Sequence, residues 1–302
     1  MELNKPTLSC DYLTKPATVL IEKISDAIGI IFEPYQTKRM AFAIAETEII
    51  KAENEIRINE IKNRASQRLI SEEYIKQNNI ENITAKAIEY LNENSCPQDI
   101  DRDWIANFFE KSKIVSNVEM QNVWAKVLAG EANNPGTFSK KTVNIINDIE
   151  RYDAQNFTTL CGFKWIINDV PKLLILDIHH DIYAGSNISV EVLTNLENIG
   201  LIKFLPTYYS VESMHGQILA NYYGRELKLS LNRKASQYLL LGYVVFTKAG
   251  EELSTICDST PVNGFFDLVF NRWDRRNLLS INTPSRLKRF IRNNFIMPKD
   301  LE

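Results

Sequence analysis

Residues 37–69 contain neither proline nor glycine and consist largely of Ala, Glu, Lys, Arg and Ile. These residue types disturb a helix least, whereas a single proline in a helix interior costs roughly 3 kcal/mol. Glu53 precedes Arg57 by four residues, and Glu60 precedes Arg64 in the same way, so each pair can form a favourable ion pair on a helix surface. The composition and spacing predict one continuous helix over residues 37–69.

The apolar positions of this predicted helix repeat at intervals of eleven residues. An eleven-residue repeat keeps an apolar stripe almost straight, which suits helices that pack side by side. We therefore expect a homo-oligomer, with self-association through Ile50, Ile58, Ile61 and Leu69. The alternative is that the stripe lies along the globular body of its own chain.

Apolar residues three and four apart predict a second helix over residues 17–32, ended by Pro34. Its apolar side could rest on a bilayer as a peripheral membrane contact, but packing on protein is the favoured interpretation. Helical character also continues through residues 72–94, and Cys96-Pro97 marks a boundary.

A helical bundle is expected beyond that boundary. Asp101 can cap a helix rich in aromatic residues, Gly130 signals the end of the next helix, and Trp165 is placed in the last one. The helices that carry Phe108 and Trp124 are expected to face each other, with their aromatic side chains in the core.

The remaining sequence alternates short β-rich runs with helices. A helix over residues 190–199, closed by Gly200, leads into a strand, and Thr247 can cap a closing helix. Helix, strand, insert, strand and helix is the order of elements in a winged helix. The predicted strands are residues 173–178, 201–205, 227–231 and 243–246.

The fold class predicted from these patterns is mainly α, with a long N-terminal helix and a helical bundle followed by a small α+β winged-helix-like domain. Four regions are expected: a helical, coiled-coil-like region over 1–96, the bundle over 97–170, the winged-helix-like domain over 171–262, and basic C-terminal helices over 263–302.

Three stretches of the sequence resemble a bacterial family known only as a domain of unknown function, DUF2806. They are Gln77 to Ile83, Asp103 to Phe109, and Val123 to Glu131 with the following Pro135 to Ser139. The tryptophan-alanine, leucine-alanine pattern of the third stretch is also similar, more loosely, to the Abi-alpha proteins of abortive phage infection. This looser likeness implies a role in anti-phage defence, and neither likeness implies catalytic residues.

The cysteines and the hydropathy limit the class of protein. Cys10, Cys96, Cys161 and Cys257 show no CxxC spacing, which argues against a disulfide framework and a zinc module. The longest apolar run, residues 239–246, is too short to span a membrane, and the first 15 residues do not resemble a secretion signal. A cytoplasmic protein is expected.

Recognisable catalytic motifs are absent from the sequence, including a phosphate-binding glycine loop and a GxSxG elbow. His179-His180-Asp181 is the densest set of metal-ligand types, but adjacent residues rarely face one metal ion. We therefore expect no catalytic residue, metal or cofactor. A hydrolase or nuclease with a spatially assembled site is kept as an alternative.

Residues 264–302 carry eight basic and four acidic residues, and residues 286–292 predict a basic amphipathic helix. Such a helix could bind nucleic acid or an anionic surface. The candidate residues are Arg272, Arg275, Arg276, Arg286, Lys288, Arg289 and Arg292. The alternative is a helix that docks on the core with its charges in solvent.

The predicted helix 190–199 contains Glu191 and Glu197 but no Lys or Arg, which argues against DNA recognition and favours a protein partner for the winged-helix-like domain. The sequence as a whole favours a non-enzymatic, self-associating interaction protein with a part in phage defence. Nucleic-acid binding through the basic C-terminal helix is the first alternative.

Overall fold

The computed structural model describes residues 14–29, 58–212, 217–231, 238–275 and 278. The chain divides into two compact units, Met1–Asp148 and Ile149–Glu302. Helices hold 56% of the described residues and strands hold 18%, so the protein has a mixed α+β fold in which helices predominate. The four-part division inferred from the sequence is finer than this one and stays a prediction.

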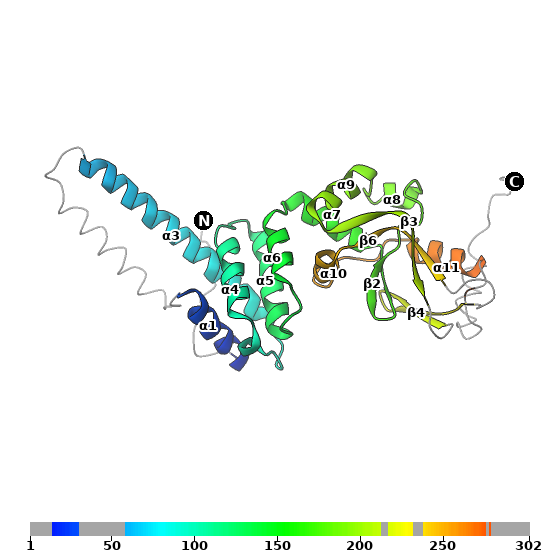
Figure 1. Ribbon diagram of the computed structural model, residues 1–302, viewed down its shortest axis with the longest axis horizontal. Helices are drawn as coiled ribbons and strands as arrows, with labels where there is room; N and C mark the ends of the chain where they lie inside the picture. Colours follow the sequence, from blue (N-terminus) through cyan, green and yellow to red (C-terminus); the bar gives the residue numbers. More distant parts are fainter. Residues whose placement is uncertain (1–13, 30–57, 213–216, 232–237, 276–277, 279–302) are drawn as a thin grey trace. The chain divides into compact units, whose positions relative to one another are not determined.

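The described part of the N-terminal unit is helical (Figure 1). Helix α3 packs on α5, while α4 packs on α1 and on α6. The helices are α1 (Lys15–Ile28), α3 (Ile58–Glu89), α4 (Arg102–Ser112), α5 (Val118–Asn133) and α6 (Lys140–Asn147), with a short 3₁₀ helix η2 (Pro97–Asp99) before α4.

Side-chain caps fix where three of these helices begin. Asp101, Asn117 and Ser139 each accept a hydrogen bond from the backbone amide three residues further on. The predicted cap at Asp101 is confirmed. The predicted end of α5 at Gly130 is wrong, because the helix continues to Asn133. Instead, Gly130 allows the ring of Phe138 to pack closely against α5, because a Cβ atom at this position would lie 2.6 Å from that ring.

Two other helix ends differ from the expectation. The first helix ends at Ile28 rather than at Pro34, because Gly29 adopts a left-handed φ of 68° and its amide bonds the carbonyl of Ser25. The helix predicted over residues 37–69 is confirmed from residue 58 onward and continues to Glu89, while residues 37–57 lie outside the described part.

Aromatic side chains form the core between α4 and α5. The ring of Phe108 stacks on Trp104 at 5.1 Å between centroids and meets the edge of Trp124 at the same distance. All three side chains are buried. The expectation that these two helices face each other across an aromatic core is confirmed.

The C-terminal unit combines five helices and two antiparallel sheets among its described residues. One sheet has the strand order β2-β1-β4-β5, and the other pairs β3 with β6. The strands are β1 (Lys164–Ile167), β2 (Val170–Leu173), β3 (Ile202–Glu212), β4 (Gln217–Tyr222), β5 (Arg225–Ser230) and β6 (Tyr238–Phe246). The helices are α7 (Arg151–Cys161), α8 (Asp181–Ala184), α9 (Val190–Ile199), α10 (Lys248–Ser254) and α11 (Phe265–Arg275).

The last predicted helix of the bundle is present as α7, but it ends at Cys161. Strand β1 follows it, so the placement of Trp165 in a helix is wrong. Asn168 and Asp169 have φ angles of 49° and 65°, and this left-handed pair turns the chain into a tight hairpin between β1 and β2. Trp165 is fully buried in β1, where it stacks on Tyr222 and Phe266.

The strand predicted over residues 173–178 is also wrong beyond Leu173, where β2 ends. The hydroxyl of Tyr183 donates to the carbonyl of Leu174 at 2.9 Å and accepts from the amide of Leu176 at 3.1 Å. These backbone groups are therefore not free to pair with a neighbouring strand, and only an isolated bridge forms, between Ile175 and Gly242.

The other three predicted strands are present and overlap β3, β5 and β6, with Leu201 and Leu231 just outside β3 and β5. Gly200 closes α9 with a φ of 93°, and the Thr247 hydroxyl caps α10 through the amide of Gly250, both as predicted. The predicted order of helix, strand, insert, strand and helix is confirmed. The insert holds the β4–β5 hairpin, which joins β1 in the four-stranded sheet.

Among the described residues, no helix is both long enough and apolar enough to cross a membrane.

Candidate self-association surface

Helix α3 extends well beyond the helices on which it packs (Figure 1). Its side chains from Glu60 to Ile75 are exposed, apart from a partly covered Asn63. From Asn79 onward its inner face is buried, with Ile83 and Ala87 fully covered. About 20 residues of α3, or roughly 30 Å of helix at 1.5 Å per residue, therefore precede the packed part.

The exposed part of α3 carries large apolar side chains. Ile61 is 64% exposed and Leu69 is 59% exposed, and both belong to the self-association residues predicted from the sequence. The sequence reasoning did not single out three further exposed apolar residues of this part, namely Ile70, Tyr74 and Ile75. Exposed apolar side chains gathered on one element are typical of a contact surface.

The exposed and the buried apolar residues of α3 share one face of the helix. Leu69 precedes the buried Ile80 by eleven residues, and Ile61 precedes the buried Ile83 by twenty-two. Eleven residues make almost three whole helical turns, so residues at this spacing point in nearly the same direction. We call Ile61, Ala65 and Leu69 the distal stripe: it continues, in solvent, the face that packs on α5.

Polar contacts fix the point at which α3 leaves the helical body. The buried amide of Asn79 donates to the carbonyl of Lys113 at 2.9 Å and to the hydroxyl of Ser116 at 3.2 Å. Its oxygen accepts a hydrogen bond of 3.2 Å from the side chain of Gln121. Asn79 thereby anchors α3 to the connection between α4 and α5.

Charged side chains surround the distal stripe. Arg68 and Glu72 form an ion pair at 3.4 Å, and Lys76 and Glu73 form another at 2.6 Å. The hydrogen bond between Lys76 and Glu73 lowers the pKa of the glutamate and raises the pKa of the lysine. Both members of that pair are therefore charged at neutral pH.

The side chains of the other two predicted self-association residues are not described. Ile58 is the first residue of α3, and its side chain is not described, while Ile50 lies outside the described residues.

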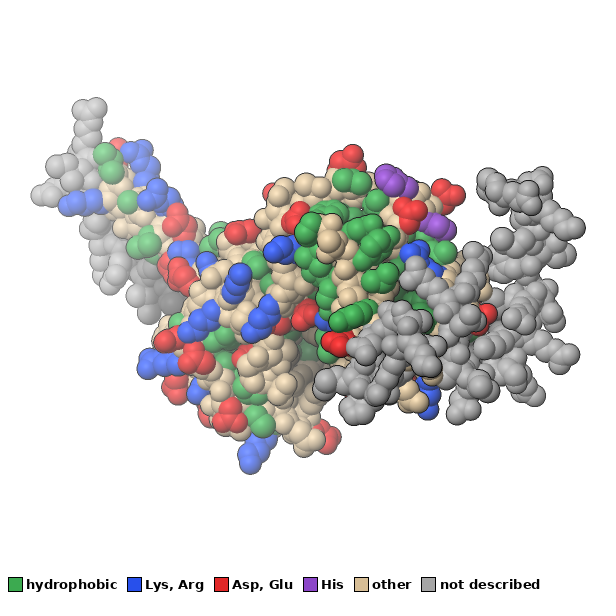
Figure 2. Space-filling view, turned by 45° about the vertical axis from the view of Figure 1, so that its right-hand side comes forward, with side chains coloured by type: hydrophobic (Ala, Val, Ile, Leu, Met, Phe, Trp, Pro, Cys, Tyr) green, Lys and Arg blue, Asp and Glu red, His purple; other side chains and the backbone are tan. Residues whose placement is uncertain are grey.

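The predicted nucleic-acid residues lie at the C-terminal end of the chain. Arg272 lies on α11, is partly buried, and lowers the pKa of Tyr183 through its charge, against the larger opposite effect of burial. Arg275 is the last residue of α11. Outside the described residues lie Arg276, Arg286, Lys288, Arg289 and Arg292. In the view of Figure 2, basic and acidic side chains of the described part are interspersed.

His179 and His180 lie in the turn that precedes α8. His180 caps α8, where its Nδ1 accepts a hydrogen bond of 3.2 Å from the amide of Ile182. In the described part of the chain, no three His, Cys, Asp or Glu residues come close enough together to hold a metal ion.

A small cavity in the C-terminal unit was not visible in the sequence, because its lining comes from β2, β3, β6 and α10. Inside it, Lys172 pairs with Glu251 at 3.2 Å and lies 5.6 Å from the ring centre of Tyr209. Its volume of about 180 Å³ is below the range of roughly 300–1,000 Å³ that is usual for small-molecule sites. We assign no ligand to it.

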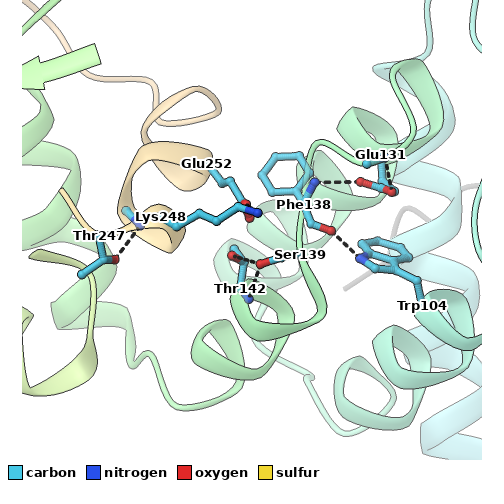
Figure 3. Close-up of polar contacts among 10 residues, drawn as sticks. Trp104, Glu131, Phe138, Ser139, Thr142, Thr247, Lys248 and Glu252 are labelled. Carbon is cyan, nitrogen blue, oxygen red and sulfur yellow. Dashed lines mark hydrogen bonds and ion pairs between the residues drawn. The ribbon is translucent and has the colours of Figure 1, made fainter. Parts of the chain in front are cut away.

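The sequence stretch that resembles the family most distinctively has a structural role. The buried Glu131 carboxylate accepts hydrogen bonds from the amides of Gly136 and Phe138, and the indole of Trp104 donates to the Phe138 carbonyl at 2.7 Å (Figure 3). These contacts fix the turn between α5 and α6 against α4. They place this stretch in the core of the N-terminal unit.

The fold is thus that of a mainly helical α+β protein, and its most prominent candidate site is an exposed apolar helix face. The chain belongs to the family described as "Protein of unknown function (DUF2806)", whose family model matches residues 63–270. A search of the curated proteins found no match. No solved structure matches either. The looser likeness to the Abi-alpha proteins finds no support in these comparisons.

Proposed function

We propose that this protein is a non-enzymatic interaction protein that self-associates through the distal stripe of α3. One observation carries the proposal: Ile61 and Leu69 are mostly exposed on the face of α3 that is buried further along the same helix. Burying an apolar side chain of this size stabilises an association by roughly 1.5–3 kcal/mol. We therefore expect the surface of a second copy to bind this face and bury it.

The oligomeric state of the purified full-length protein tests this proposal. Light scattering coupled to size-exclusion chromatography is expected to give a multiple of the 34.8 kDa chain mass for the unaltered protein. The double variant Ile61→Glu/Leu69→Glu is expected to elute as a monomer, because two carboxylates would replace apolar groups in the contact. A monomer at every concentration of the unaltered protein would contradict the proposal.

A matched control separates the effect of the stripe from a general effect of charge. Gln67 is exposed on α3 and lies roughly 160° around the helix from Leu69, at 100° per residue. The variant Gln67→Glu is therefore expected to keep the mass of the unaltered protein. Circular dichroism is expected to show the same helix content in all variants, since these side chains lie outside the core.

We propose a second contact surface, for another protein, on the region that the sequence predicts to be winged-helix-like. The order α9, β3, β6 and α10 supports this interpretation. Helix α9 has no Lys or Arg, and its Glu197 accepts a hydrogen bond from the amide of Phe204 at 2.7 Å. A helix without cations is poorly suited to phosphate contacts, which favours a protein partner over DNA.

The remaining functions stay predictions. Nucleic-acid binding through the basic C-terminal helix predicts salt-sensitive binding that weakens when Arg286, Arg289 and Arg292 become Glu. A role in phage defence predicts that cells with the gene plate phage less efficiently than cells without it. A spatially assembled hydrolase or nuclease site predicts turnover of a generic ester or nucleic-acid substrate by the purified protein.

A further inference from the structure

Two cysteines of the C-terminal unit are far apart in the sequence but meet in the structure. Cys161 is the last residue of α7, and Cys257 lies three residues beyond the end of α10. Their side chains are hydrogen-bond partners. Both are present as thiols, and Cys161 is buried while Cys257 is partly exposed. The pair therefore has one thiol in the core and one that solvent can reach.

Close packing holds the end of α7 against the chain between α10 and α11, residues 255–264, which we call the α10–α11 connection. A Cβ atom on Gly162 would lie 2.9 Å from the carbonyl oxygen of Thr260 and 3.0 Å from a methyl group of Val262. The hydroxyl of Tyr222 joins the same segments, because it donates to the carbonyl of Gly162 at 2.8 Å and accepts from the amide of Val262 at 2.7 Å. The two segments that carry the cysteines are therefore fixed against each other.

Two further side chains bridge these segments next to the pair. The hydroxyl of Tyr223 donates to the carbonyl of Cys161 at 3.3 Å and shares a hydrogen bond of 2.6 Å with the hydroxyl of Ser259. The amine of Lys164 donates to the carbonyl of Ser254, the last residue of α10. None of these contacts uses a thiol, so the fold brings the two cysteines together without depending on a bond between them.

The two thiols differ in how they can react. Burial raises the pKa of the Cys161 thiol well above its ordinary value, the contact with Cys257 acts in the same direction, and the charge of Lys164 opposes both. Cys161 is therefore protonated at neutral pH, whereas the thiolate is the form that attacks an oxidant. An oxidant dissolved in water accordingly meets the partly exposed Cys257 first, with Cys161 beside it as the second thiol.

We propose that Cys161 and Cys257 are a redox-sensitive pair that forms a reversible disulfide when the protein meets hydrogen peroxide. The sulfur of Cys257 attacks one oxygen of the peroxide, the O–O bond breaks, and the leaving hydroxide takes the thiol proton to become water. The sulfur of Cys161 then attacks the resulting sulfenic acid, so that an S–S bond forms, the S–O bond breaks, and the second thiol proton leaves in another water molecule. Two thiols are thus oxidised to one disulfide while one hydrogen peroxide is reduced to two water molecules.

The backbone on one side of the pair can adjust to the bond. A disulfide needs Cα atoms within about 7 Å and two sulfur atoms about 2.05 Å apart, so thiols in hydrogen-bond contact must move closer together. Cys257 lies in irregular backbone and can make this movement, whereas Cys161 is held by α7. The disulfide would tie the α10–α11 connection to the end of α7. It does not depend on the proposed self-association, which uses α3 in the other unit.

Peptide mapping of the full-length protein tests the proposal. The reduced protein is treated with hydrogen peroxide, its remaining thiols are alkylated, and it is digested without reductant for mass spectrometry. We expect a peptide pair joined through Cys161 and Cys257 that separates on treatment with dithiothreitol, and a single-chain band in non-reducing electrophoresis. An alkylated Cys161 together with sulfinic or sulfonic acid at Cys257 would overturn the proposal, as would disulfides that join two chains instead.

Thermal unfolding with a matched control gives an independent measurement. A disulfide between segments so far apart in the sequence restricts the unfolded chain, so peroxide is expected to raise the Tm of the unaltered protein by about 5–10 °C. Cys257→Ser is expected to abolish this rise, whereas Cys96→Ser, also at a partly exposed position, is expected to keep it. An equal rise in Cys257→Ser would show that other residues are responsible and would contradict the proposed pair.

Discussion

The buried carboxylate of Glu131 accepts a hydrogen bond of 2.8 Å from the backbone amide of Phe138. The same carboxylate accepts a second one of 2.7 Å from Gly136. Replacing Glu131 by Ala would leave these two amides without that acceptor, and a lost charge-assisted bond in the interior costs roughly 1.5–3 kcal/mol. We expect Glu131→Ala to lower the free energy of unfolding by about 3 kcal/mol in urea titrations.

The control for this prediction is Glu110→Ala. Glu110 forms an ion pair with Lys113 at 2.6 Å, but its side chain is 72% exposed. Surface pairs contribute about 0–1 kcal/mol, so this variant is expected to unfold almost like the unaltered protein. Equal losses in both variants would show that the buried position of Glu131 has no special role.

Gly250 of α10 lies against the carbonyl oxygen of Leu201, which a Cβ atom at that position would strike. Since that oxygen is backbone, α10 would have to move away, and Gly250→Ala is expected to destabilise the C-terminal unit by about 3 kcal/mol or more. Gly224→Ala is the comparison: Gly224 has a φ of 84° but open space around it, so only backbone strain of about 1 kcal/mol is expected. Thermal unfolding of the two variants measures the difference.

Burial raises the pKa of Tyr183 to about 12 from an ordinary value of 10.0. The folded state therefore binds this proton more tightly than the unfolded state does. The resulting stabilisation, on the order of 2–3 kcal/mol, is complete below pH 10 and is lost as the pH rises through about 12. Urea unfolding is expected to show an alkaline loss, and Tyr183→Phe is expected to remove only part of it, because burial also raises the pKa of Tyr222 to about 12. Tyr152→Phe, at an exposed position, is expected to leave the loss unchanged.

Local signals in the sequence predicted much of the fold. The caps at Asp101 and Thr247 and the glycine end at Gly200 depend on residues within three or four positions, and the structure confirms all three. The pairing of β1 with β4 was missed because Ile166 contacts Asn221, which lies far away in the sequence. Long-range pairing of this kind overrides the local helix signal around Trp165.

The candidate surface was predictable only in part. The eleven-residue spacing identified Ile61 and Leu69 as members of one apolar stripe. It could not show which part of the stripe is exposed, because the body of the unit ends where Asn79 meets Lys113 and Ser116, more than thirty residues further along the chain.

Asn79 is expected to control how firmly α3 is held where it leaves the body. In Asn79→Ala, the carbonyl of Lys113 and the side chain of Gln121 lose a hydrogen-bond partner, with an expected loss of about 2 kcal/mol. Hydrogen exchange is expected to become faster in the α3 amides next to residue 79, while exchange in α6 stays unchanged. The neighbouring Asn78 is exposed, so Asn78→Ala is the matched control and is expected to exchange like the unaltered protein. If both variants exchanged alike, the anchoring of α3 would have to come from the apolar contacts of Ile80 and Ile83 alone.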